Sequence, residues 1–159
     1  MAKQQERKGT KTHAVSLITL VDPSSPISEQ YRTIRTNIQF ASSADRQIKT
    51  MVITSSGPGE GKSTTSANLA VVFAKSGQRV LLVDADMRKP TVYKTFNLQN
   101  NTGLSTVLST STTVVEAAQK TVIDNLSVMT SGPKPPNPSE LLGSTRMNQV
   151  IEEAKNLYD

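Results

Sequence analysis

A glycine-rich segment constrains the fold of this chain more than any other feature of its sequence. It spans residues 55–63, follows the apolar, β-rich run 50–54, and precedes a helix expected over about residues 64–76. A second run, 80–83, is apolar throughout, as strands are when a parallel sheet is covered on both faces. Strand, helix and strand joined by short links form a βαβ unit with a right-handed crossover. The sequence therefore predicts an α/β domain of three layers with a mostly parallel sheet.

The glycine-rich segment fits a phosphate-binding loop, whose usual pattern is Gly-x-x-x-x-Gly-Lys-Ser/Thr. Gly61, Lys62 and Ser63 are in place, but Ser56 stands where the first glycine is expected. Glycines allow backbone N–H groups to turn inward around phosphate oxygens, and the positive end of the following helix adds to the attraction. Lys62 can reach the β- and γ-phosphates, and the Ser63 hydroxyl can hold Mg²⁺. The alternative is a glycine-rich turn that binds nothing, but the position between a strand and a helix favours nucleotide binding. The residues expected to bind the nucleotide are Gly57, Pro58, Gly59, Glu60, Gly61, Lys62, Ser63 and Thr64.

Two carboxylates follow the second apolar run. Asp84 and Asp86 are expected beside the phosphate loop, because ligands gather at the carboxyl ends of parallel strands. One carboxylate can coordinate Mg²⁺, and the other can accept the proton of an attacking hydroxyl. The expected catalytic residues are thus Lys62, Asp84 and Asp86, and the expected metal-binding residues are Ser63 and Asp84, with the two aspartate roles open to exchange. Taken alone, the pair would be a solvated strand end; beside a phosphate loop it indicates a site.

Composition excludes several classes of protein. The chain has 159 residues, a formal net charge of +5, no cysteine, no tryptophan and a single histidine, His13. A disulfide scaffold, a cysteine-based metal site and a Ser-His-Asp hydrolase are therefore not expected. Residues 1–25 are expected to form a basic tail and a leading loop, and no apolar run approaches the ~18 residues of a membrane span. We expect a protein of the cytoplasmic side that binds no specific nucleic acid, because a moderate positive charge alone does not establish such binding.

Amphipathic helices are expected near both ends of the domain, which we place at residues 26–159. After Ser28, a candidate N-cap, one apolar stripe recurs at helical spacing: Ile27, Tyr31, Ile34, Ile38 and Ala41. Glu29, Arg32 and Arg35 repeat every three residues on the opposite side. The last helix carries a similar stripe, made of Met147, Val150, Ile151, Ala154 and Leu157. Between the two helices, residues 126–130 predict a third strand, and Thr113 and Glu116 have capping-box spacing.

Four segments together resemble the bacterial tyrosine kinases (BY-kinases), the cytoplasmic kinases of capsule and exopolysaccharide synthesis in Gram-positive bacteria. Asp84-x-Asp86-x-Arg88 resembles their second, A-prime Walker motif, and residues 58–64 resemble their phosphate loop. Glu29-x-x-Arg32-x-x-Arg35 matches their oligomerisation motif. Residues 135–142, Pro-Pro-Asn-Pro-Ser-Glu-Leu-Leu, resemble a further family segment. The resemblance covers residues 26–159.

The resemblance implies a reaction and partners that composition and spacing do not. The reaction is transfer of the γ-phosphate of ATP, with Mg²⁺, to tyrosine hydroxyls of protein substrates and of the kinase itself. The implied partners are a transmembrane activator of the polysaccharide system and further copies of the chain in a ring-like homo-oligomer, with Glu29, Arg32 and Arg35 at the interface. The implied place is the inner face of the plasma membrane, reached through the activator. The implied fold is a P-loop NTPase-like domain similar to the MinD/ParA group.

The chain departs from the family pattern in two ways. The family has a further apolar strand that ends in Asp-Ser/Thr-Pro-Pro, the Walker B motif, and that normally begins after a pair like Tyr158-Asp159. The family also has a C-terminal tyrosine cluster, whereas the tyrosines here are Tyr31, Tyr93 and Tyr158. We therefore expect the chain to correspond to the N-terminal two thirds of such a kinase, and to be poorly folded and inactive alone.

Two other functions stay open at this stage. The first is a MinD/ParA-like switch ATPase that phosphorylates no protein; Gly57 stands where that group carries a signature lysine, which favours the kinase. The second is a catalytically inactive interaction module that keeps only the nucleotide pocket and the oligomerisation helix. Because the Walker B strand is absent from this sequence, the second alternative stays open.

Overall fold

The central sheet of this computed structural model, which describes residues 15–42 and 47–159, has three strands. They are β1 (Val80–Val83), β2 (Ala118–Lys120) and β3 (Leu126–Met129), in the spatial order β1-β3-β2. β1 runs parallel to β3, with Leu82 opposite Val128, and β2 runs antiparallel to β3. The sheet is therefore mixed: its parallel pair is β1 with β3, and the βαβ unit expected from residues 50–54 and 80–83 does not form in the described chain.

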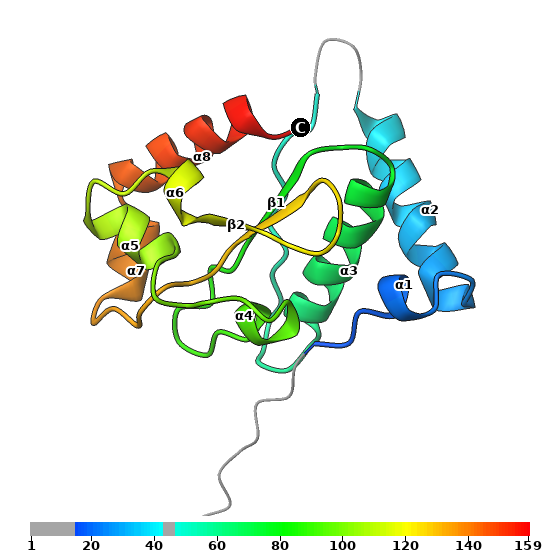
Figure 1. The fold of residues 1–159 in the computed structure, drawn as a ribbon, viewed down its shortest axis with the longest axis horizontal. Helices are drawn as coiled ribbons and strands as arrows, with labels where there is room; N and C mark the ends of the chain where they lie inside the picture. Colours follow the sequence, from blue (N-terminus) through cyan, green and yellow to red (C-terminus); the bar gives the residue numbers. More distant parts are fainter. Residues whose placement is uncertain (1–14, 43–46) are drawn as a thin grey trace, which may run out of the picture.

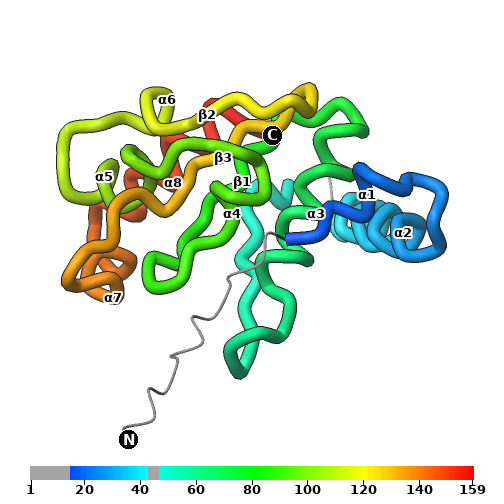
Figure 2. The backbone as a smooth tube through the Cα atoms, turned by 60° about the horizontal axis from the view of Figure 1, so that its bottom comes forward, coloured from blue at the N-terminus to red at the C-terminus, as the bar shows by residue number. Residues whose placement is uncertain are grey.

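Helices cover both faces of the sheet, which confirms the three-layer α/β architecture (Figure 1). On one side lie α1 (Ile18–Val21), α2 (Pro26–Ala41) and α3 (Lys62–Lys75). The other side carries α5 (Leu104–Ser109), α7 (Pro138–Leu142) and α8 (Thr145–Leu157). Figure 2, a turned view, shows these three helices on the same side. The short helices α4 (Val92–Thr95) and α6 (Val114–Ala117) connect the sheet to these layers.

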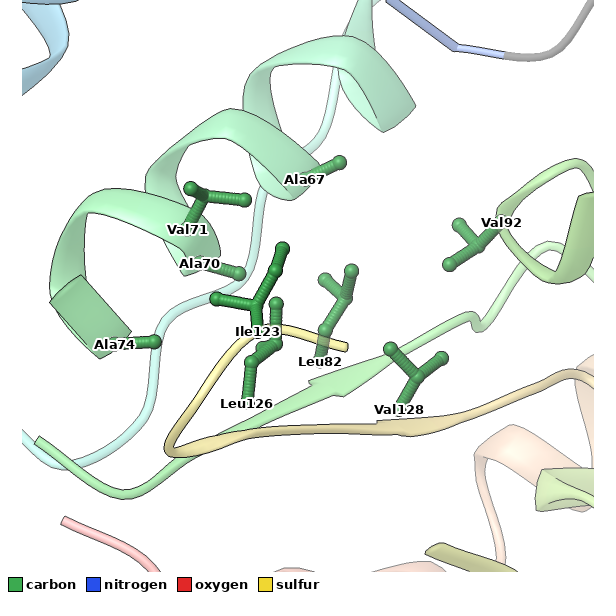
Figure 3. Close-up of a cluster of buried hydrophobic side chains, with 9 residues drawn as sticks. All are labelled: Ala67, Ala70, Val71, Ala74, Leu82, Val92, Ile123, Leu126 and Val128. Atoms are coloured by element: carbon green, nitrogen blue, oxygen red, sulfur yellow. The ribbon is translucent and has the colours of Figure 1, made fainter. Parts of the chain in front are cut away.

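The strands are apolar because each face of the sheet meets a separate core. Leu82 and Val128 pack against the small residues of α3, Ala67, Ala70 and Ala74 (Figure 3). Leu81 and Met129 instead contact the second core, which the helices α5, α6 and α8 supply. Successive strand residues point to opposite faces, so a strand between two helical layers has no polar face. This explains the uninterrupted run 80–83.

The strand expected at residues 50–54 is wrong in this structure, which has that segment as extended chain outside the sheet. Val52 is 92% exposed and Met51 48%. No backbone hydrogen bond joins residues 49–54 to any other part of the chain that the structure describes. A cavity of about 690 Å³ lies between this segment and β1, with α3 and α8 as its walls. An apolar run is a strand only when a neighbour pairs with it, and here the neighbour on the β1 side is separated by the cavity.

Helix α2 begins earlier and packs differently from the expectation. Its N-cap is Ser25, whose hydroxyl accepts the Ser28 N–H at 3.1 Å, and Pro26 takes the first turn. Ser28, expected as the cap, is fully buried inside the helix. Of the expected stripe, Ile27 is 58% and Ile34 42% exposed, so only part of it packs inward.

The remaining expectations have mixed outcomes. The third strand, the last helix and the Thr113–Glu116 capping box are confirmed. Helix α1 lies within residues 1–25, the region expected as tail and leading loop; residues 1–14 of that region lie outside the described residues. The domain boundary at residue 26 stays a prediction. Within the two described ranges, no helix is long and apolar enough to cross a membrane.

Candidate functional site

The glycine-rich loop has the backbone of a phosphate-binding site. Gly59 and Gly61 have φ angles of 76° and 87°, the left-handed region that favours glycine. Gly61 is also the N-cap of α3, and no side chain caps the helix there. The N–H groups of the first turn are therefore available to an anion, and the helix dipole favours negative charge at this end. Loop and helix together provide an anion site without any basic side chain.

Lys62 is folded over this loop. Its Nζ donates to the Ser55 hydroxyl at 2.8 Å and to the Gly57 carbonyl at 3.1 Å. The ammonium thus stays at the mouth of the loop, held by two neutral acceptors that a phosphate oxygen would outcompete, because charge-assisted hydrogen bonds are stronger than neutral ones. Ser55 is a contact that spacing alone did not predict.

Glu60 closes the loop from its exposed side. The Ser56 hydroxyl donates to its carboxylate at 3.3 Å, and hydrogen bonding, chiefly from the Gly57 backbone, holds the pKa of Glu60 below its usual value. A side chain so engaged stabilises the loop conformation. The Glu60 side chain therefore bonds within the loop, and its expected contact with nucleotide stays a prediction.

The two aspartates lie at the carboxyl end of β1 in different environments. Asp84 is only 5% exposed; its Oδ1 accepts the Asp86 N–H at 3.1 Å and its Oδ2 the Val92 N–H at 3.2 Å. Burial raises the pKa of Asp84, and these N–H groups offset only part of that effect. Asp86 is exposed, and its Oδ1 accepts the N–H groups of Arg88 and Lys89. One carboxylate is fixed and buried, and the other faces solvent.

One cavity brings the predicted residues together. The space of about 690 Å³ beside β1 is lined by Lys62, Ser63, Asp84 and Asp86, residues from two separate segments. Its remaining walls are largely apolar. The first turn of α3 and the acidic pair thus line the same space, whereas the glycines of the loop are not among its lining residues.

A residue from α7 reaches the rim of this cavity. Arg88 donates from Nη2 to the Ser139 hydroxyl at 3.4 Å, which links the acidic segment to the start of α7. Ser139 belongs to the segment 135–142 that carries the family resemblance, but spacing did not place it beside Arg88. Only the tertiary fold brings the two together.

The donor set suits Mg²⁺ better than a transition metal. In the described part of the chain, no group of three or more His, Cys, Asp or Glu side chains is placed to hold a metal ion. A hydroxyl and one or two carboxylates are the ligands that Mg²⁺ takes when phosphate oxygens and water complete its shell. Ser63 and Asp84, which line the same cavity, fit that role.

The Glu29, Arg32 and Arg35 triplet does not lie on a single face. The Arg32 guanidinium donates from Nε to Glu29 Oε2 at 2.9 Å and from Nη1 to the Pro23 carbonyl at 2.8 Å, both at the surface. Arg35 points inward, and its Nη1 donates to the Val72 carbonyl of α3 at 3.3 Å. Its Nε is buried and has no hydrogen-bond partner within the described residues. Two members of the triplet are thus open to a partner, and the third packs within the subunit.

The chain is similar to known proteins over most of its length. The family of AAA domains matches residues 48–159. Tyrosine-protein kinase YwqD of Bacillus subtilis is 56% identical over 144 residues, 91% of this chain and 60% of the relative. The putative tyrosine-protein kinase CapB of Staphylococcus aureus is 47% identical over 137 residues, 86% and 60% of the two chains.

Two solved structures resemble this one closely. The chimerical protein CapA2B2 superposes with a TM-score of 0.83 at 47% identity, over 91% of this chain and 65% of the other. The kinase domain of the Escherichia coli tyrosine kinase ETK superposes with a TM-score of 0.84 at 32% identity, over 98% and 61%. The chain thus spans about 60% of the length of the first relatives that it matches.

Proposed function

Because the chain belongs to the AAA-domain family, in its bacterial tyrosine-kinase branch, we propose that it acts in an ATP-dependent, autophosphorylating protein-tyrosine kinase of capsule or exopolysaccharide synthesis. One observation carries the proposal. The first turn of α3, with Lys62 and Ser63 directly after the glycine loop, shares a cavity with Asp84 and Asp86. Phosphoryl transfer needs a phosphate cradle, a metal anchor and a proton acceptor, and this cavity is lined by a candidate for each.

The nucleotide would bind with its phosphates in the loop of residues 57–64. First-turn N–H groups of α3 and the ammonium of Lys62 would contact the β- and γ-phosphate oxygens. Ser63 and Asp84 would hold Mg²⁺, which when bound neutralises charge on those oxygens. Asp84 suits this role because it is buried and fixed by two backbone N–H groups.

Asp86 would receive the proton of the tyrosine hydroxyl. It is exposed on the cavity rim, where an incoming side chain has access, and its Oδ2 accepts no hydrogen bond from the residues that the structure describes. Arg88, two residues further on, would neutralise charge on the transferred phosphate. The structural difference between the two aspartates thus favours one assignment of the roles that the sequence left open.

The proposed partners follow from the family. They are a transmembrane activator protein, tyrosine-containing substrates and further copies of this chain, with Glu29 and Arg32 at the interface and Arg35 supporting them from inside the subunit. Contact with the activator would keep the protein at the cytoplasmic face of the membrane.

Nucleotide binding is the first test, measured by titrating a fluorescent ADP analogue with Mg²⁺. Two lengths are used: the 159-residue chain, and the same chain continued after Asp159 with the remaining, unmatched C-terminal part of the Bacillus subtilis relative, here called the extended chain. Lys62→Met removes the ammonium and keeps most of the side-chain volume; Lys120→Met on the exposed face of β2 is the matched control. We expect a loss of affinity of ~10-fold or more for Lys62→Met and none for the control. Equal affinity for the two variants would refute the phosphate-loop assignment.

A further inference from the structure

A fully buried asparagine on α3 joins the phosphate-loop helix to the segment that precedes α2. Asn68 is 0% exposed. Its Oδ1 accepts the Thr19 N–H at 3.0 Å and the Thr19 hydroxyl at 2.8 Å. Its Nδ2 donates to the Ser16 carbonyl at 2.8 Å and to the Thr64 carbonyl at 2.9 Å. A side-chain amide offers two donors and two lone pairs, so this network uses all of them.

The segment held in this way, residues 15–22 with α1, is here called the N-terminal arm. Val15, Leu17 and Leu20 pack on the apolar core beneath it, but apolar contacts alone do not fix a unique register. The Lys75 ammonium also donates to the Thr19 carbonyl, at 3.0 Å. A shifted arm would leave Asn68 buried with unpaired groups, which costs far more than a matched network. The polar network therefore selects a single docked position.

The arm is tied to α2 in the same manner. The Ser28 hydroxyl, fully buried, donates to the Asp22 carbonyl at 2.7 Å and to the Ile18 carbonyl at 3.2 Å. Ser28 directly precedes Glu29, the first residue of the proposed oligomer interface. Hydrogen bonds thus join Thr64 and Asn68 of α3 to the arm, and the arm to Ser28 of α2, with the backbone of the arm between the two sets.

We propose that Asn68 is a positioning residue that couples the nucleotide site to α2 through the N-terminal arm. The inference rests on the proposed function, since it assumes a nucleotide at the loop and a second copy of the chain at α2. Thr64 follows Ser63 in the turn that would receive the phosphates, so a bound nucleotide fixes the carbonyl that Asn68 contacts. The same side chain sets the register of the arm. Reciprocity of binding free energies then requires that assembly through α2 strengthen nucleotide binding by the factor by which nucleotide strengthens assembly.

Amide hydrogen exchange of the arm, with and without Mg-ADP, tests the coupling. It is measured in the shorter of the two chains that binds Mg-ADP. We expect Mg-ADP to slow exchange of the Thr19 amide by ~5-fold or more, the lower end of ordinary coupling factors. In Asn68→Ala this effect should fall below ~2-fold although Mg-ADP still binds. Light scattering should show the same loss: Mg-ADP shifts the assembly of the parent chain but not that of the variant.

Three further variants separate positioning from mere stability. Thr19→Val removes one hydroxyl from the network and keeps its shape, so it should reduce the nucleotide effect; Thr19→Ser keeps the hydroxyl and should restore it. Thr121→Val makes the same change at a hydroxyl that serves the β2–β3 connection and should lower stability without altering the effect. If Asn68→Ala does not fold, the comparison of Thr19→Val with Thr19→Ser tests the coupling.

The outcomes distinguish this inference from the proposed function. A Thr19 amide that Mg-ADP protects equally in the parent chain, Asn68→Ala and Thr19→Val overturns the inference. So does a parent chain that binds Mg-ADP with no change in the arm. Failure of the parent chain to bind Mg-ADP overturns the proposed function, and the inference with it.

Discussion

Asp84 and Asp86 are two residues apart, but only Asp84 is buried, and this difference leads to distinct kinetic predictions. Asp86→Asn removes the proposed proton acceptor and keeps the size of the side chain, so kcat should fall by ~10²-fold or more with ATP binding largely retained. Asp84→Asn should instead raise the Mg²⁺ concentration needed for half-maximal rate. Steady-state phosphorylation of a tyrosine peptide by the extended chain measures both. Near-normal rates in both variants would refute the acidic site. If Asp84→Asn lowers kcat and Asp86→Asn raises the Mg²⁺ requirement, Asp84 is the proton acceptor and Asp86 the metal ligand.

The raised pKa of Asp84 predicts a pH dependence of metal binding. The folded state holds this proton more tightly than the unfolded state, so the contribution of Asp84 to stability is full below the unfolded pKa of about 4 and is lost as the pH rises through the folded pKa. Mg²⁺ binds the ionised carboxylate. The Mg²⁺ requirement for nucleotide binding should therefore grow as the pH falls from neutral towards the raised pKa of Asp84, and Asp84→Asn should flatten the curve. Parallel curves for the parent chain and the variant would exclude Asp84 as a metal ligand.

At the level of residues, the sequence predicted neighbours along the chain better than contacts between distant segments. Lys62, Ser63 and Asp84 line one cavity, and their selection depended on short spacing along one loop or one strand end; their chemical roles stay predictions. The Ser55 hydroxyl on Lys62 and the Ser139 hydroxyl on Arg88 depend on how distant segments pack. No periodicity in the sequence encodes those contacts.

At the level of elements, α2 shows where helical periodicity misleads. The apolar stripe predicted one buried face, but buried Ser28 and half-buried Arg35 occupy the side toward the N-terminal arm and α3. Polar side chains can face inward here because backbone carbonyls of neighbouring helices accept their hydrogen bonds. Ile27 and Ile34 are left exposed, which gives α2 an apolar strip beside its ion pair.

The exposed part of the triplet predicts an effect on assembly. Within one subunit the Glu29–Arg32 pair is a surface i,i+3 pair of only ~0.5 kcal/mol. Replacing both residues by alanine should therefore leave the melting temperature nearly unchanged and shift the light-scattering mass of the extended chain towards monomer. Replacing exposed Gln30 and Asn37 of the same helix is the control. If the oligomer keeps its mass in the Glu29/Arg32 variant, the pair is not part of the interface.

Arg35→Ala is expected to act differently from the other two. Its guanidinium donates to the Val72 carbonyl, so its loss should lower the melting temperature as well as weaken assembly. A melting curve measured below the assembly concentration separates the two effects.

At the level of the whole molecule, the cavity beside β1 is the main departure from an ordinary three-layer domain. β1 pairs with β3 on one side only, and the extended segment 49–54 pairs with nothing in the described chain. Tyr158 is already extended, and the Asp159 N–H donates to the Arg79 carbonyl at 2.9 Å, just before β1. The fold class and the three long helices, α2, α3 and α8, could be predicted from the sequence. The strand predicted at residues 50–54 is absent, because strand formation depends on a partner that the segment itself does not encode.

We predict that a strand that occupies this cavity increases the stability of the fold strongly. A strand that continues from Asp159 parallel to β1 would pair the open edges, bury apolar side chains and place its Walker B aspartate near Ser63. The extended chain should therefore melt cooperatively at a temperature higher by roughly 10 °C, a few kcal/mol for a domain of this size. The 159-residue chain should melt broadly and bind Mg-ADP weakly. Circular-dichroism melting of both lengths makes the comparison; equal melting curves would mean that the cavity does not accept this strand.

The central proposal is that the site at the carboxyl end of β1, where Lys62 and Ser63 meet Asp84 and Asp86, transfers phosphate from ATP to tyrosine. The most direct measurement follows the labelled γ-phosphate of ATP in the extended chain, counting label on tyrosine against label released as inorganic phosphate. The kinase account predicts label on tyrosine, lost in Lys62→Met and Asp86→Asn and kept in Lys120→Met. Release of inorganic phosphate alone, with no labelled tyrosine on the chain or on an acceptor peptide, would contradict it and indicate a switch ATPase.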